Sequence, residues 1–218
     1  MFIGHFGVAF AAKRAVPTVR LGTLFIACEF LDLLWPIFLL AGVEVVAITP
    51  GSTKFTPLDF EHYPWSHSLL MAAFWALAFG AAYFARQRRW IPAAALALVV
   101  LSHWFLDLIV HRPDLPLAPG LDMKVGLDLW NSVAGTLLVE GALFVAGVRI
   151  YLAGSQAKDR TGHWALYGLL ALLVVAYFGA AFGAPPPSVP AIAGTGLVGF
   201  AVAAALGYWI DSHRTMKA

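Results

Sequence analysis

The feature that most constrains the fold is a succession of apolar runs, each about long enough to cross a lipid bilayer. A spanning helix needs about 20 predominantly apolar residues. Six runs meet or approach this length, the last of them rich in Gly and Ala: 21–48, 66–85, 91–110, 129–152, 164–182 and 189–210. Residues 2–15 are also apolar but too few to cross, so we expect a helix that enters the bilayer only partway. Pro36 is expected to kink the first span.

The composition agrees with a membrane protein. The chain is 61% hydrophobic and 12% charged, whereas soluble domains have about 45–50% apolar and about 25% charged residues. We therefore predict one all-α integral membrane domain over residues 1–218, with about six transmembrane helices, a short half-inserted N-terminal helix and the lipid bilayer as partner. The lone Cys28 excludes an intramolecular disulfide and a Cys-rich zinc site. A net charge of +2 gives no basic patch, so nucleic-acid binding is not expected.

Lysine and arginine gather in alternate connections between the apolar runs. They precede the first run, separate the second from the third and the fourth from the fifth, and follow the sixth: Lys13, Arg14, Arg20, Arg86, Arg88, Arg89, Lys158, Arg160, Arg214 and Lys217. Cytoplasmic loops carry such an excess of positive charge. The alternation predicts that both termini face the cytoplasm.

The outer end of the third span carries a polar stripe. His103, Asp107 and His111 are spaced four residues apart, and residues at i, i+4 and i+8 of a helix share one face. The predicted orientation puts this stripe in the outer half of the bilayer. Polar residues of three other segments are expected near the same level: His5, Asp32, His62 and His67.

Imidazoles and carboxylates gathered inside a bilayer suit a divalent cation, because an ionisable group there needs a partner. Histidine nitrogen and aspartate oxygen are ligands of zinc, and less selectively of manganese or iron. The candidate metal ligands are His5, Asp32, His67, His103, Asp107 and His111. Six candidates exceed the ligand number of one zinc, so one or two ions are expected, with Asp32 or Asp107 as the bridging carboxylate. Residues 1–114 would carry the site and residues 129–210 a three-helix scaffold.

Two further residues are candidates for catalysis. Glu29, three residues before Asp32, would act as a general base or orient a ligand. His62 lies in the loop before the second span, although a histidine in such a place is more often an interfacial hydrogen-bonding residue. Two other interpretations remain open: His103 and Asp107 as a simple helix-surface pair, and Asp32 as a proton-relay carboxylate.

Several short motifs resemble those of a known family. They are Gly4-His5, the acidic pair Glu29 and Asp32, His67-Ser68-Leu69-Leu70, and Ser102-His103 followed by Asp107. Over residues 1–114 the chain resembles a family of prokaryotic membrane-bound metal-dependent hydrolases. The family's acidic motif resembles Pro-Asp-x-Asp, and here only Asp32 matches it. The order of the histidines and aspartates is also similar to that of the zinc-dependent phospholipase C and nuclease superfamily. The resemblance implies a bacterial or archaeal plasma membrane and hydrolysis of phosphoesters.

Two main functions are therefore expected from the sequence. The first is an intramembrane metal-dependent hydrolase that acts on a phosphoester of a lipid or lipid-linked substrate from the outer half of the bilayer. The alternative is a metal-ion or proton transporter that uses the same His/Asp cluster, although the two halves of the chain do not resemble the inverted repeats frequent in transporters. A non-catalytic assembly factor with a structural metal forms a third class.

Overall fold

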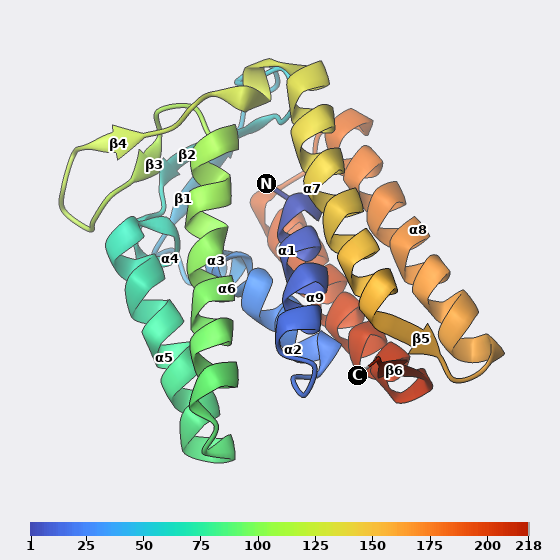
Figure 1. Ribbon diagram of the computed structural model, residues 1–218. Coiled ribbons are helices and arrows are strands. Elements are labelled where there is room, and N and C mark those ends of the chain that lie inside the picture. Colours follow the sequence, from blue (N-terminus) through green and yellow to red (C-terminus); the bar gives the residue numbers. More distant parts are fainter. Residues whose placement is uncertain (218) are drawn as a thin grey trace.

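The computed structural model describes residues 1–217 and is built almost entirely of helices (Figure 1). Five helices are long and apolar enough to cross a membrane: α5 (Leu69–Gln87), α6 (Trp90–Val110), α7 (Val133–Gly154), α8 (Arg160–Phe182) and α9 (Val189–His213). A bent pair, α2 (Leu21–Cys28) and α3 (Phe30–Leu40), would raise the number to six. The prediction of an all-α protein with several apolar helices of spanning length is therefore confirmed.

The sharp bend in the first apolar run lies at Glu29, where α2 and α3 meet at 55°. Pro36, the expected position of a kink, lies inside α3 and is not the site of this 55° bend. The break interrupts the ladder of backbone hydrogen bonds, in which each carbonyl accepts from the amide four residues later. The carbonyl of Cys28 is thereby released from the helix and becomes available to a side chain.

The short helix α1 (Ile3–Ala15) lies among the long helices, between the α5–α6 hairpin and the group formed by α7, α8 and α9 (Figure 1). It packs very closely on α7, because two glycines meet there. An added Cβ at Gly147 would overlap the carbonyl oxygen of Gly7, and one at Gly7 would overlap the backbone at Leu143. Small residues allow helices to approach in this way. The contact fixes the position of α1 and of the histidine that it carries.

Short strands and small helices join the long helices at both ends of the bundle (Figure 1). At one end, β1 (Val45–Ile48) pairs antiparallel with β2 (Leu58–His62), and β3 (Leu115–Pro116) pairs with β4 (Lys124–Val125). Helix α4 (Pro64–His67) and a 3₁₀ helix (Leu129–Asn131) lie in the same connections. At the other end, β5 (Ser155–Ala157) pairs with β6 (Arg214–Met216). The connections expected on opposite sides of the membrane thus lie at opposite ends of the bundle.

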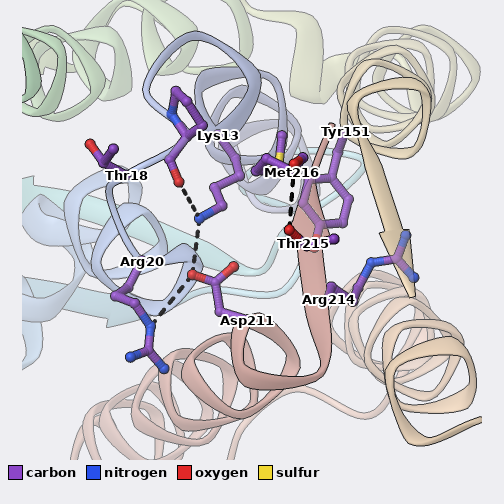
Figure 2. A pocket seen from close by; sticks show the side chains of 9 residues that line it. Lys13, Thr18, Arg20, Tyr151, Asp211, Arg214, Thr215 and Met216 are labelled. Atoms are coloured by element: carbon purple, nitrogen blue, oxygen red, sulfur yellow. Dashed lines mark hydrogen bonds and ion pairs between the residues drawn. The ribbon is translucent and has the colours of Figure 1, made fainter. Parts of the chain in front are cut away.

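A charged cluster ties α1 to α9 at the end that carries β5 and β6 (Figure 2). Lys13 donates to Asp211 at 3.0 Å and to the carbonyls of Pro17 and Val19 at 3.0 and 2.7 Å. Arg20 also lies 3.5 Å from Asp211. The ammonium group of Lys13 therefore has all three of its donors used. This cluster borders a cavity of about 280 Å³, but its buried lysine is satisfied within the protein and we assign it a structural role.

Candidate metal centre

Five of the six predicted metal ligands come together in one buried cluster. They are drawn from four helices: His5 from α1, Asp32 from α3, His67 from α4, and His103 and Asp107 from α6. Their ligand atoms form two overlapping groups, each within 4.8 Å: His5 with Asp32 and His103, and His67 with His103 and Asp107. All these side chains are nearly inaccessible except Asp32, which is 23% exposed. We call this set the His/Asp cluster.

His103 is oriented by the helix break. Its Nδ1 lies 2.7 Å from the carbonyl oxygen of Cys28, the group that the bend at Glu29 releases. A carbonyl can only accept, so Nδ1 carries the proton. In the neutral ring, Nε2 then has a free lone pair, which lies 3.1 Å from Asp107 Oδ2 and 3.7 Å from Asp32 Oδ1. This nitrogen has no hydrogen-bond partner among residues 1–217.

His67 is oriented by a two-step relay that sequence reasoning missed. The hydroxyl of Ser66 lies 2.7 Å from both Glu44 Oε2 and His67 Nδ1. Because the carboxylate only accepts, the single hydroxyl proton goes to Glu44, and Ser66 accepts the Nδ1 proton of His67. Glu44 is held in turn by the backbone amides of Trp65 and Ser66, at 2.9 and 2.8 Å. The sequence spacing of Glu44 and Ser66 does not predict that they touch. They meet only because the 43–65 connection folds onto α4.

Asp107 lies between the three histidines of the cluster. Its Oδ1 is 3.2 Å from His5 Nε2, and its Oδ2 is 3.1 Å from His103 Nε2 and 3.7 Å from His67 Nε2. The amino group of Met1 also lies 2.5 Å from Oδ1. The rings of His5 and His103 are stacked with centroids 3.7 Å apart. A carboxylate whose two oxygens face different histidines is suited to the bridging position expected from the sequence.

The fixed tautomers have a direct electrostatic consequence. With Nδ1 as the donor on each ring, the Nε2 atoms of His67 and His103 face the carboxylates of Asp32 and Asp107 at 3.1–3.7 Å, where each carries a lone pair in the neutral ring and a proton in the imidazolium. Lone pairs facing anions repel one another unless a proton or a cation lies between them. Ligand atoms about 2.0–2.2 Å from a tetrahedral zinc are about 3.4 Å from each other. The observed spacing therefore fits a divalent cation, and the buried cluster could hold a metal ion.

His111, the sixth predicted ligand, lies outside both groups of ligand atoms. Its Nδ1 is 2.9 Å from Asp114 Oδ1 and 3.2 Å from the hydroxyl of Tyr63, and its ring packs on Trp130 with centroids 4.3 Å apart. Burial lowers the pKa of His111, and the hydrogen bond to Asp114 only partly offsets this effect. The ring is therefore neutral, donates from Nδ1 to Asp114, and keeps Nε2 unprotonated.

The two predicted catalytic residues occupy different places. Glu29 is buried at the helix break, where Oε1 lies 3.7 Å from the thiol of Cys28 and Oε2 has no partner within the described part of the chain. His62 is exposed at the end of β2 and borders a separate hollow with Pro116 and Lys124. Neither residue lines the cavity of the cluster, and Glu29 lies next to the residue that orients His103.

A cavity of about 270 Å³ opens beside the His/Asp cluster. Its polar side is formed by Asp32, His67, Asp107 and His111. The rest of its wall is mainly apolar and includes side chains of α3, β2, α8 and α9: Trp35, Pro36, Leu58, Phe60, Ala180, Ile192 and Phe200. A cavity with convergent polar groups at one side and apolar walls elsewhere is typical of a ligand-binding site.

Sequence reasoning thus identified most of the polar residues that meet in the fold. Its ligands His5, Asp32, His67, His103 and Asp107 converge, while His111 pairs with Asp114 and His62 lies apart. Comparison of the chain with protein-family models, curated proteins and solved structures finds no match.

Proposed function

We propose that the protein is an intramembrane metal-dependent hydrolase that cleaves a phosphoester of a lipid or lipid-linked substrate. The observation that carries the proposal is the orientation of His67 and His103. Both rings donate their Nδ1 proton outward, to Ser66 and to the carbonyl of Cys28, and thereby turn Nε2 inward to the carboxylates of Asp32 and Asp107. Such outward hydrogen bonds are the usual support of metal-ligating histidines.

The ligand set would be His5, Asp32, His67, His103 and Asp107 around one or two divalent ions. Nitrogen and carboxylate donors favour zinc, with manganese or iron as alternatives. A bound cation would supply Lewis-acid stabilisation of the phosphoryl oxygens and activate water for attack. This chemistry agrees with the metal-dependent hydrolase family that the sequence resembles over residues 1–114, and we propose membership of that family.

Two polar residues near the cluster, Glu29 and His111, would transfer protons during the reaction. Glu29 is buried next to Cys28, and its Oε2 has no partner among residues 1–217; it would be the general base of the reaction. His111 lines the cavity with Nε2 unused, and its pair with Asp114 would stabilise the ring while it carries a proton to or from the leaving group. The partial exposure of Asp32 would keep one ligand open to the cavity.

The membrane setting completes the proposal. The bent pair α2–α3 would form a sixth span and α1 would enter the bilayer partway, with both termini in the cytoplasm of a bacterium or archaeon. This orientation is supported by the alternation of lysine and arginine between connections. The cavity would then open in the outer half of the bilayer, and its apolar wall favours a substrate with acyl or prenyl chains.

The decisive experiment measures metal content and hydrolysis on the same purified protein. We expect one or two equivalents of transition metal by elemental analysis, and metal-dependent cleavage of bis(4-nitrophenyl) phosphate and of phospholipid vesicles. His103→Ala and Asp107→Ala should lose metal and reduce kcat by at least about 100-fold, whereas His163→Ala, which changes an exposed histidine of α8, should do neither. Full activity of the first two variants, or protein without metal, would refute the proposal. Zinc uptake into proteoliposomes that depends on His103 would favour transport instead.

A further inference from the structure

A second polar site lies beside the cavity of the His/Asp cluster. It is a cavity of about 110 Å³ that contains two buried polar side chains, Glu140 of α7 and Tyr177 of α8. It shares five lining residues with the larger cavity: Met1, Phe2, Thr56, Trp130 and Ala180. The two cavities therefore lie next to each other and are bounded in part by the same five residues. Neither Glu140 nor Tyr177 belongs to the His/Asp cluster.

Glu140 is held in place but left half unsatisfied. Its side chain is buried, with the residue only 1% exposed, and Oε2 accepts from the backbone amides of Phe2 at 2.7 Å and Gly4 at 3.4 Å. These amides belong to the start of α1, where the helix dipole stabilises a negative charge. The second oxygen, Oε1, has no hydrogen-bond partner among residues 1–217. A buried carboxylate oxygen without a hydrogen-bond partner is energetically unfavourable, and most buried polar atoms in native proteins have such a partner.

Tyr177 is similarly fixed and unsatisfied. Its ring packs between Phe2 and Phe55, with centroids 6.3 and 5.6 Å away, and the residue is 2% exposed. Its hydroxyl also has no partner in the described structure. A buried tyrosine hydroxyl normally finds a hydrogen-bond partner. With the ring packed on both aromatic neighbours, the hydroxyl is available to a ligand or to water.

We propose that Glu140 and Tyr177 form a head-group subsite that binds a hydrogen-bond-donating group, a hydroxyl or a primary ammonium, of the substrate whose phosphoester reaches the His/Asp cluster. The inference rests on the proposed function only in assigning that substrate; the subsite itself is argued from unsatisfied groups in a shared cavity. A water molecule needs at least about 10–15 Å³ of such space, so 110 Å³ accepts a group of several heavy atoms. Glu140 Oε1 and the Tyr177 hydroxyl can both accept hydrogen bonds, so a group with N–H or O–H gains contacts here that a group without them lacks.

The test compares two zwitterionic lipids with identical short chains. Dihexanoyl phosphatidylethanolamine carries a primary ammonium, and dihexanoyl phosphatidylcholine carries a trimethylammonium with no donor. Binding is measured by native mass spectrometry and titration calorimetry on chelator-treated protein, so that no hydrolysis takes place. We expect the wild-type protein to bind the ethanolamine lipid at least about 10-fold more tightly than the choline lipid.

Three variants decide whether Glu140 and Tyr177 cause the preference. Glu140→Gln and Tyr177→Phe should each reduce it to about two-fold or less, while Tyr167→Phe, an exposed tyrosine of the same helix, should retain it. Tyr177→Phe removes a hydroxyl that has no partner, so it keeps the test valid even if Glu140→Gln fails to fold. Two results would overturn the proposal: equal binding of both lipids by the wild type, or a preference for the ethanolamine lipid that survives in Tyr177→Phe. In either case the unpartnered groups would be hydrated by water. A preference without any hydrolysis by metal-loaded protein would refute the proposed function but support the subsite.

Discussion

The Nδ1 atom of His103 lies 2.7 Å from the carbonyl oxygen of Cys28, and this contact exists because the helix that carries Cys28 ends there. In an unbroken helix that carbonyl would accept from the amide of Asp32. The 55° bend at Glu29 instead directs it to His103 and starts a new helix whose first turn carries Asp32. One break in the backbone therefore both orients His103 and brings Asp32 to the same cluster.

Removing the metal should destabilise the protein. Binding to the folded state alone adds RT ln(1 + [L]/Kd), or about 2.7 kcal/mol at a ligand concentration 100 times Kd. We expect chelation to lower Tm in detergent and zinc to restore it. His103→Ala should show no response to either treatment, because it removes a central residue of the proposed metal site. A Tm of the wild-type protein that is insensitive to chelator and zinc would contradict the metal site.

Loss of the relay behind His67 should weaken metal binding without removing a ligand. Ser66→Ala leaves Nδ1 of His67 without its acceptor and Glu44 without one of its donors. Changes to such outer partners usually reduce metal affinity by about 10- to 100-fold. Competition with a fluorescent zinc chelator measures the change. Ser212→Ala, at an exposed serine of α9, serves as the matched control and should bind zinc as tightly as the wild type.

The close contact between α1 and α7 should not tolerate a methyl group. Gly147→Ala would drive a Cβ into the carbonyl of Gly7, and overpacking of this kind typically costs about 1–3 kcal/mol. Because α1 carries His5, the substitution should also lower zinc content. Gly141→Ala on the same helix meets nothing within 4 Å and should be neutral or stabilising. Thermal unfolding and elemental analysis of both variants check the prediction, which fails if the two substitutions behave alike.

Asp114 should contribute to stability in a pH-dependent way. Burial alone would raise the pKa of Asp114, but hydrogen bonds from His111, Arg112 and Tyr63 outweigh this effect and hold it below its usual range. The ionised Asp114 therefore contributes fully to the free energy of unfolding above the ordinary pKa of an aspartate, about 3.9. This contribution is lost as the pH falls through the lower pKa that Asp114 has in the folded protein.

Asp114→Asn should accordingly lower stability at pH 7 by about 1–3 kcal/mol, the usual loss when hydrogen bonds to a charged group are removed. Its difference in Tm from the wild type should stay constant from pH 7 to about 5 and shrink as the pH is lowered further toward 3. Asp122→Asn, in the exposed connection between β3 and β4, should match the wild type throughout. A difference between Asp114→Asn and the wild type that does not change with pH would show that charge is not its cause.

The sequence by itself determined the long helices and the chemical nature of the cluster. Apolar runs predicted α5 to α9 within a few residues of each bound, because the length and hydropathy of a span are local properties. The rarity of polar residues in such runs also identified His5, Asp32, His67, His103 and Asp107, since each charge or imidazole in a bilayer needs a partner.

Only the tertiary structure decided how these residues are used. The carbonyl of Cys28 became a partner for His103 through a backbone break that no local signal near Pro36 predicted. His111 shares a helical stripe with Asp107 by spacing, yet it begins the connection after α6 and turns to Asp114 instead. Glu44 supports His67 through Ser66, and Glu140 lies beside the site through its contact with Phe2. Both contacts join segments far apart in the chain. Periodicity orders residues along one helix, whereas hydrogen-bond direction between helices is set by how the helices pack.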